Sequence, residues 1–146
     1  MARYVIERIN VTPVSGNDIL SVISAASRRV RLVDVSVTGV GTTSASQALQ
    51  IGRATAGTTP GGAIVPSKAD NSDQPASTFT TATTWSVQPT VETNAIAVGW
   101  NAIGGNWIKN FTKGVFEARN GDVISVRAIA GVTYQPMNIS IIVEED

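Results

Sequence analysis

The sequence predicts an all-β chain that folds as an antiparallel β-sandwich. Its 146 residues include 18 Val, 14 Ile and 16 Thr but 3 Leu, and β-branched side chains favour strands over helices. Several segments alternate apolar and polar residues, which is typical of strands with one buried face, and 13 Gly and 6 Pro supply turns between them. The length is that of one ordinary domain, so we expect residues 1–146 to share a single core.

Four strands are expected in the first part of the chain. Residues 4–14 mix apolar and charged side chains and end near Pro13, as an edge strand can. Residues 18–26 fit an apolar helical face as well as a strand, and the β-branched content favours the strand. Residues 33–37 alternate valine with polar residues, and residues 49–51 repeat that alternation over a shorter stretch.

A long connection follows, over about residues 57–84. It opens with a turn-rich run of Gly, Thr and Pro and then consists almost entirely of small or polar residues, with Phe79 as its one aromatic. Both flanks are strand-like, and neither flank could bury a core alone. We therefore interpret the segment as a long extended surface loop within one domain and not as a linker.

Strand patterns return after this connection. Residues 96–100 place Ile, Val and Trp on one side, and a glycine-rich turn leads to a further strand at residues 107–109. Within residues 115–127, Asn120-Gly121 is the strongest hairpin signal in the sequence. Residues 138–144 alternate to the end, which predicts a final strand in a sheet. About eight strands, with the first and last free to lie side by side, favour a jelly-roll-like or related Greek-key sandwich.

The chain contains no His and no Cys, the residues on which most enzyme sites depend. Ser-His-Asp triads, Cys-His pairs, disulfides and sulfur-bound zinc or iron-sulfur sites are therefore excluded. Asp70 and Asp73 lack the glycine and the distal glutamate of a hand-type calcium loop, so no metal is expected. We predict a protein that is not an enzyme and has no cofactor, with a glycosidase built on two carboxylates as the remaining enzymatic alternative.

Charge and hydropathy also limit the partners. The 11 basic and 11 acidic residues give a formal net charge of zero, and no segment concentrates enough positive charge to follow a phosphate backbone. No apolar run approaches the roughly 20 residues of a membrane-spanning helix, and the N-terminus has no signal-peptide pattern. We therefore expect no nucleic acid and no membrane as a partner, and a chain that stays in the cytoplasm unless it leaves on a larger particle.

Three segments together carry a resemblance to a known family. Residues 61–82 read GGAIVPSKADNSDQPASTFTTA, a glycine-rich turn followed by spaced Pro, Lys and Asp residues. Residues 29–37 read RVRLVDVSV, a strand that follows the Asp-Ile-Leu of residues 18–20, and residues 141–146 read IIVEED, an apolar strand with terminal acids. In this order they resemble the head decoration, or cement, proteins of tailed bacteriophages, and the likeness covers most of the chain.

The resemblance implies a structural virion protein that is made in the host cytoplasm. Proteins of this family are jelly-roll domains, commonly homotrimers, that bind the outside of the capsid and tie neighbouring coat subunits together. The major capsid protein is then the expected partner, and a homotrimer is the expected assembly. The alternative is a carbohydrate-binding or receptor-binding module of the same fold on a phage tail or fibre.

The long connection supplies most of the candidate contact residues. An extended, proline-interrupted segment such as residues 65–84 can lie along a neighbouring chain as a capsid-gripping or subunit-swapping arm. The alternative is a surface loop with no partner. The candidate contacts in this segment are Pro66, Lys68, Asp70, Asp73, Pro75 and Phe79.

Tryptophan and arginine give the remaining candidates. Trp100 shares one strand face with other large apolar residues and is expected in the core. Trp85 and Trp107 lie beside polar loop residues, where a tryptophan could contact another chain or stack on a sugar. A cluster of arginines at a strand start could pair with an acidic coat surface or form an ordinary solvated strand end. These arginines are Arg28, Arg29 and Arg31.

Overall fold

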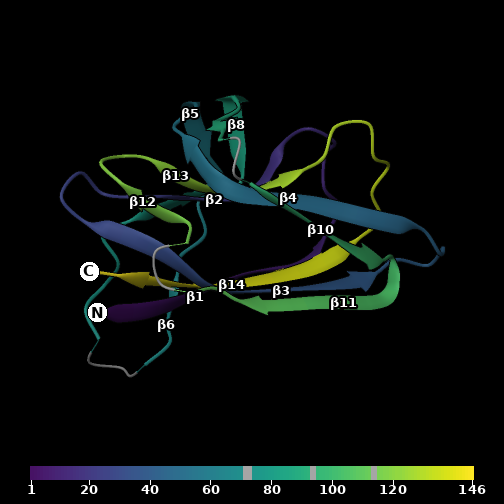
Figure 1. The fold of residues 1–146 in the computed structure, drawn as a ribbon, viewed down its shortest axis with the longest axis horizontal. Helices are drawn as coiled ribbons and strands as arrows, with labels where there is room; N and C mark the ends of the chain where they lie inside the picture. Colours follow the sequence, from purple (N-terminus) through teal and green to yellow (C-terminus); the bar gives the residue numbers. More distant parts are fainter. Residues whose placement is uncertain (71–73, 93–94, 113–114) are drawn as a thin grey trace.

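The computed structural model describes residues 1–70, 74–92, 95–112 and 115–146, and it is all-β in these ranges (Figure 1). Two large antiparallel sheets, named sheet 1 and sheet 2 below, face each other as a β-sandwich, and a two-stranded ribbon lies over sheet 2. The predicted fold class is therefore confirmed. No helix within the described ranges is long and apolar enough to cross a membrane.

Sheet 1 contains the first and the last strand of the chain. These two strands pair antiparallel from Ala2 and Glu145 to Arg8 and Ile139, so they lie side by side as predicted. Across the sheet, the order is β11 (Ile103–Asn110), β3 (Arg29–Val40), β14 (Met137–Glu145), β1 (Ala2–Val11) and β6 (Ser67–Lys68), and β12 (Glu117–Arg119) pairs with the start of β3.

Sheet 2 forms the other layer of the sandwich (Figure 1). Across this sheet, the order is β10 (Ile96–Asn101), β4 (Ser46–Thr55), β13 (Val123–Ala128), β2 (Asp18–Ile23) and β7 (Thr80–Ala82), and β9 (Thr90–Val91) pairs with the end of β4. The separate ribbon consists of β5 (Thr58–Gly61) and β8 (Thr84–Val87).

Eight of the 14 strands in the described ranges have six or more residues, which matches the number expected. Counted along the chain, the first pairs with the eighth (β1 with β14), the second with the seventh (β2 with β13), the third with the sixth (β3 with β11) and the fourth with the fifth (β4 with β10). The chain is thus arranged as one long hairpin whose successive strand pairs lie in alternate sheets. Two further pairings, β14 with β3 and β13 with β4, complete the sheets.

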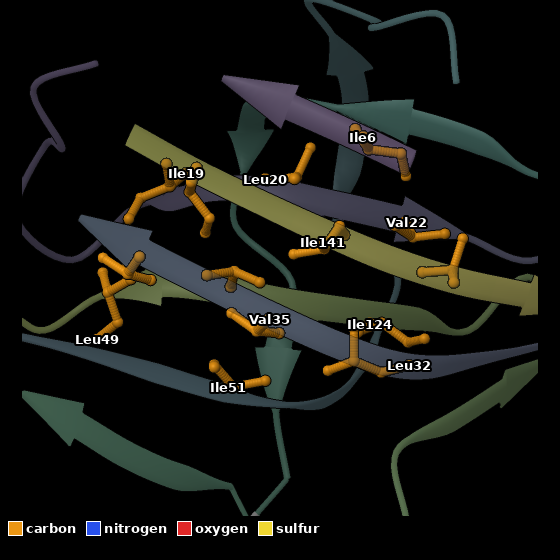
Figure 2. Close-up of a cluster of buried hydrophobic side chains, with 14 of the residues drawn as sticks. Ile6, Ile19, Leu20, Val22, Leu32, Val35, Leu49, Ile51, Ile124 and Ile141 are labelled. Atoms are coloured by element: carbon orange, nitrogen blue, oxygen red, sulfur yellow. The ribbon is translucent and has the colours of Figure 1, made fainter. Parts of the chain in front are cut away.

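The hydrophobic core lies between the two sheets (Figure 2). Trp100 belongs to it at 7% exposure, as predicted. Fully burying an aliphatic side chain contributes roughly 1.5–3 kcal/mol, so a core of this size stabilises the fold without a disulfide. The labelled core side chains, none more than 2% exposed, are Ile6, Ile19, Leu20, Val22, Leu32, Val35, Leu49, Ile51, Ile124 and Ile141.

The ambiguous segment at residues 18–26 is a strand over Asp18–Ile23, so the preference for a strand is confirmed. Its side chains are buried on both faces of the sheet. Leu20 and Val22 belong to the core between the sheets, whereas Ile23 packs beneath the ribbon with a second apolar cluster. A strand covered on both sides does not show a clean alternation of apolar and polar residues, which is why its pattern also fits a helix.

The prediction of a hairpin at Asn120-Gly121 is wrong. The turn itself exists, because Asn120 and Gly121 both have positive φ (55° and 87°) and the Asp122 N–H donates to the Arg119 carbonyl at 3.0 Å. However, β12 pairs with β3 in sheet 1, and β13 pairs with β2 and β4 in sheet 2. Turn residues determine where the chain reverses, but long-range pairing determines which strand lies beside which.

The long connection is more ordered than the expected loop at residues 57–84, because it contains β5, β6 and β7. The short strand β6 pairs with β1, and β7 pairs with β2, so the connection covers the edge that both sheets present at β1 and β2. An uncovered strand edge exposes unpaired backbone groups. The connection pairs with part of each edge within its own subunit, at Tyr4 and Val5 on β1 and at residues 21–23 on β2.

Candidate interaction surface

The outer face of sheet 1 is open across its four long strands, and no strand lies against its centre in Figure 1. One row of outward side chains runs across it from Ile108 on β11 through Ser36 and Ser140 to Glu7 on β1. The outer face of sheet 2 differs, because Trp85 of the ribbon packs there in a cluster with residues from β2, β4, β7, β9 and β13. Sheet 1 is therefore the layer with a face available to a partner.

Small uncharged side chains form the middle of this face. Ser36, Thr38, Asn138 and Ser140 line a shallow groove of about 170 Å³, and Glu7 and Ile9 border it on β1. Ile9, on β1, is 70% exposed. Ile108, on β11 at the other edge of the same face, is 63% exposed. Apolar side chains on both sides of a polar centre suit contact with another protein surface. We name this set the sheet 1 face: Ile9, Ser36, Thr38, Ile108, Asn138 and Ser140.

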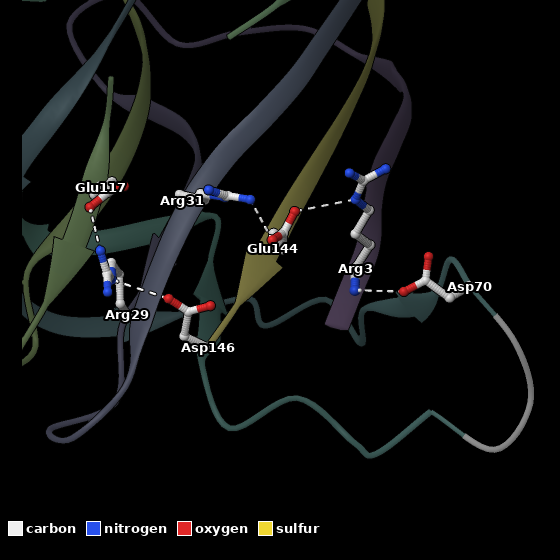
Figure 3. Close-up of polar contacts among 7 residues, drawn as sticks. All are labelled: Arg3, Arg29, Arg31, Asp70, Glu117, Glu144 and Asp146. Atoms are coloured by element: carbon white, nitrogen blue, oxygen red, sulfur yellow. Dashed lines mark hydrogen bonds and ion pairs between the residues drawn. The ribbon is translucent and has the colours of Figure 1, made fainter. Parts of the chain in front are cut away.

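A row of ion pairs crosses the same sheet near the C-terminal end of β14 (Figure 3). Arg3, Glu144, Arg31 and Glu117 are successive cross-strand neighbours on β1, β14, β3 and β12. Glu144 is 3% exposed and accepts from Arg3 Nε at 3.2 Å and from Arg31. Burial alone raises the pKa of Glu144, but the hydrogen bonds from Arg31 and Arg3 outweigh burial and lower the pKa below its ordinary value.

In the predicted arginine cluster, Arg31 and Arg29 are partly buried and paired, and Arg28 is exposed. The Arg31 side chain is 15% exposed and forms an ion pair with Glu144. Arg29 pairs with Glu117 at 3.4 Å and with Asp146 at 3.3 Å. Arg28 is exposed, and its guanidinium has no hydrogen-bond or ion-pair partner in the part of the chain that the structure describes. Of the three, Arg28 is therefore the one that a partner could reach freely.

The described residues of the long connection make several contacts within their own subunit. The Asp70 carboxylate accepts from the Arg3 N–H at 3.2 Å (Figure 3), and the Arg3 carbonyl accepts from the Ala69 N–H at 2.9 Å. Tyr4 donates its hydroxyl to the Pro75 carbonyl at 2.8 Å. Pro66 is partly exposed and Lys68 lies exposed on β6. The candidate Asp73 lies outside the described residues.

A buried glutamate that the sequence reasoning missed fastens this connection. Glu145 is 6% exposed, and its carboxylate accepts from the Thr78 N–H at 3.1 Å, the Phe79 N–H at 3.0 Å and the Thr78 hydroxyl. Phe79 is 3% exposed and packs edge to face on Tyr4, with ring centroids 5.3 Å apart. Phe79 therefore has a role inside the subunit, and we no longer count it as a contact candidate.

The two candidate tryptophans also pack against residues of their own subunit. Trp85 is 9% exposed, and its Nε1–H donates to the Ser21 hydroxyl at 2.9 Å. Trp107 is half-buried and packs against the main core from β11. We therefore remove Trp85 from the contact candidates, since its ring is not open to a sugar or a neighbouring chain.

Beneath Trp85 lies a buried polar cluster that no local sequence motif indicates. The Asp18 carboxylate accepts from the hydroxyl of Ser21 at 2.6 Å, the hydroxyl of Ser125 at 2.8 Å and the Nε of Arg127 at 2.6 Å. The Asp18 side chain is fully buried. Each serine hydroxyl donates to a carboxylate that is already paired with arginine, so the cluster ties strands β2 and β13 together.

The described residues provide no cluster of metal ligands. Among the residues that the structure describes, no group of three or more Asp and Glu side chains could hold a metal ion. No protein-family model, curated protein or solved structure matches this chain. Functional conclusions therefore depend on the geometry of the sheet 1 face and on the family resemblance of the sequence.

Proposed function

We propose that this chain is a structural virion protein, a decoration or cement subunit that binds the outside of a tailed-phage head and stabilises contacts between coat subunits. Its partner is the major capsid protein, and its assembly is a homotrimer. The observation that carries the proposal is the open sheet 1 face, with a polar centre between Ile9 and Ile108. A formal net charge of zero and a surface of this mixed character suit a protein partner.

The strand order supports the jelly-roll form that the resemblance implies. A jelly roll contains eight strands in two sheets, formed from two Greek keys. In this chain, eight long strands pair first with last, second with seventh, third with sixth and fourth with fifth, and they alternate between the sheets. We propose that the sandwich is a jelly roll on this ground.

The segments that carry the resemblance also meet in space. Residues 29–37 lie in β3, between β11 and β14 of sheet 1. The terminal acids Glu144, Glu145 and Asp146 bind Arg31, the long connection and Arg29 respectively. Strands β6 and β7, which belong to the segment 61–82, pair with β1 and β2. The three sequence features therefore belong to one structural unit, which is what a shared fold requires.

Cementing is a matter of added binding free energy. A subunit that contacts two coat proteins stabilises the joint between them, and three linked subunits raise the effective concentration of each contact. Modest contacts per subunit then give slow dissociation of the trimer. A contact face built on four long paired strands keeps one geometry and loses little conformational entropy on binding.

The proposal is tested with heads of the phage that encodes this chain, prepared without the protein. Adding the purified protein should give saturable co-sedimentation with the heads, and decorated heads should release their DNA at a higher temperature than bare heads. Bovine serum albumin at the same concentration serves as the control. Heads that bind no protein, or that release DNA at an unchanged temperature when saturated, would contradict the proposed function.

The alternative, a sugar-binding module on a tail or fibre, required an exposed tryptophan ring that could stack on a sugar. That alternative depended on Trp85 or Trp107 as an exposed stacking ring, but Trp85 is buried between the ribbon and sheet 2, and Trp107 packs on the core. If this chain binds a sugar, the binding groups must be other residues.

A further inference from the structure

We infer that a cavity at one edge of the sandwich binds a neutral saccharide. The cavity has a volume of about 520 Å³, within the usual range for small-molecule sites. Both sheets contribute to it. Its lining includes Arg53, Glu92 and Ile96 from the side of sheet 2 and Phe116, Glu117 and Arg119 from the side of sheet 1.

The charged groups in this cavity balance one another. Two arginines and two glutamates line it, so their formal charges sum to zero. A site for an anion or a cation would carry an excess of the opposite charge. An uncharged ligand that can both donate and accept hydrogen bonds is therefore the better match, and sugar hydroxyls do both.

The pairing inside the cavity leaves donors and acceptors available. Arg53 Nε and one terminal nitrogen both donate to the same oxygen of Glu92, at 2.9 and 2.7 Å. The second Glu92 oxygen and the other terminal nitrogen of Arg53 have no partner within the described ranges. Glu117 pairs through one oxygen with Arg29 at 3.4 Å, while Arg119 is 61% exposed and lies 4.0 Å from that oxygen. These groups can meet several hydroxyls at once.

An apolar wall accompanies the charged groups. Phe116 is half-buried in the lining and packs edge to face on Phe111, with ring centroids 5.4 Å apart. Its φ of 45° is unusual for a bulky residue, and such strained backbone is concentrated at ligand sites. Phe116 and Ile96 offer apolar surface to the C–H face of a sugar ring, while the arginines and glutamates meet its hydroxyls.

Binding without cleavage is the chemistry that this arrangement favours. A glycosidase needs two carboxyl groups, one of which holds a proton for the leaving oxygen. Here Glu92 pairs with Arg53 and Glu117 pairs with Arg29, so both carboxylates in the lining are held by an arginine. The cavity lies apart from the sheet 1 face, so saccharide binding does not depend on head binding.

The test is a titration of the whole chain, labelled with ¹⁵N and ¹³C, with the methyl glycosides of glucose, galactose, mannose, rhamnose and N-acetylglucosamine. Each glycoside is added at up to about 20 mM, so that even weak binding is detected. At least one should shift the resonances of Arg53, Glu92, Ile96 and Phe116 together. Glu92→Gln should weaken that binding about tenfold, because it removes a charged hydrogen-bonding group. The matched control Glu7→Gln, an exposed position outside the cavity, should bind as the unmodified chain does.

Phe116→Leu provides a second variant that keeps an apolar side chain but removes the ring, and it should also weaken binding. Three outcomes overturn the inference: no shifts with any of the five glycosides, shifts confined to residues outside the cavity, or binding of equal strength by the Glu92→Gln and unmodified chains. Binding of glucose 6-phosphate without binding of neutral glycosides would also overturn it. A failure of head binding leaves these readouts unaffected.

Discussion

Glu144 lies between Arg3 and Arg31, which belong to the two strands that flank β14, and its side chain is 3% exposed. The two arginines come from the first 31 residues of the chain, whereas Glu144 lies near the end. Breaking a buried pair leaves charges without a partner in a poorly solvated place. At the residue scale, paired charges between distant segments hold the outer side of sheet 1 together.

Replacing this carboxylate tests that account. Glu144→Gln keeps the size of the side chain but removes the charge that faces both arginines, so it should lower the free energy of unfolding at pH 7 by about 2–3 kcal/mol. Urea unfolding measures the difference. Glu7→Gln, an exposed change on the same sheet, should alter the free energy of unfolding by no more than about 0.5 kcal/mol.

The same pair predicts a pH dependence. The pKa of Glu144 in the folded chain is below its ordinary value of 4.5, so its contribution to stability is complete above that value and is lost as the pH falls towards the folded pKa. The difference in stability between the unmodified chain and Glu144→Gln should therefore shrink below pH 4.5. A difference that stays constant from pH 7 to pH 3 would show that the ionised carboxylate is not the stabilising group.

The buried Asp18 cluster gives a second prediction at this scale. Asp18→Asn leaves Arg127 without its charged partner in a buried site, so the free energy of unfolding should fall by about 3–5 kcal/mol. Asp70→Asn is the matched control, since the Asp70 side chain is exposed and an amide oxygen can still accept from the Arg3 N–H. Equal effects of the two substitutions in urea unfolding would contradict the role given to the cluster.

At the scale of elements, the long connection differs most from the expected loop. Its strands β6 and β7 close the edge at β1 and β2, and its ribbon places Trp85 over sheet 2. Glu145 holds the middle of the connection through the Thr78 and Phe79 backbone. The connection therefore covers part of two sheet edges that could otherwise pair with other chains.

Removing the Glu145 carboxylate should release this cover locally. Glu145→Ala should increase amide hydrogen exchange in β6, in β7 and at Phe79 by at least about tenfold, because local opening becomes easier there. Exchange in β3 and β13 should change much less, and these strands serve as the internal control. Equal acceleration everywhere, or none in the connection, would contradict the role of Glu145 as its fastening point.

The elements differ in how far their sequence determined them. Residues 33–37 were predictable as a strand because one face is buried and the other is not, and the same holds for residues 138–144. Strand β6 was not, because its pairing with β1 uses backbone groups that any residue offers. The turn at Asn120-Gly121 was predictable, but β12 pairs with a segment about 90 residues away and β13 pairs with one at least 100 residues away.

The candidate contact residues also include features that a local pattern predicts and features that depend on distant segments. Arg28, Arg29 and Arg31 could be recognised as a cluster, but their partners Glu117, Glu144 and Asp146 lie too far along the sequence for any local pattern to pair them. The sheet 1 face was missed for a related reason. Its side chains come from four strands, and they become one surface only when the register is known.

At the scale of the whole molecule, the two layers have different surroundings. The outer side of sheet 2 carries the ribbon, whereas the outer side of sheet 1 is open (Figure 1). The proposed trimer makes a direct prediction for the free protein. Light scattering should give a mass near three times 15.2 kDa, and a mass of 15.2 kDa over the whole concentration range would contradict assembly before head binding.

The most direct test of the central claim, that the sheet 1 face binds the head, compares two exposed apolar positions. Ile108 lies on that face at 63% exposure, and Val87 lies on the ribbon strand β8 at 60% exposure. The measurement is the dissociation constant for undecorated heads after Ile108→Asp and after Val87→Asp. Ile108→Asp should weaken binding at least about tenfold, and Val87→Asp should leave it unchanged. Unchanged binding by Ile108→Asp, or an equal loss in both variants, would contradict the claim.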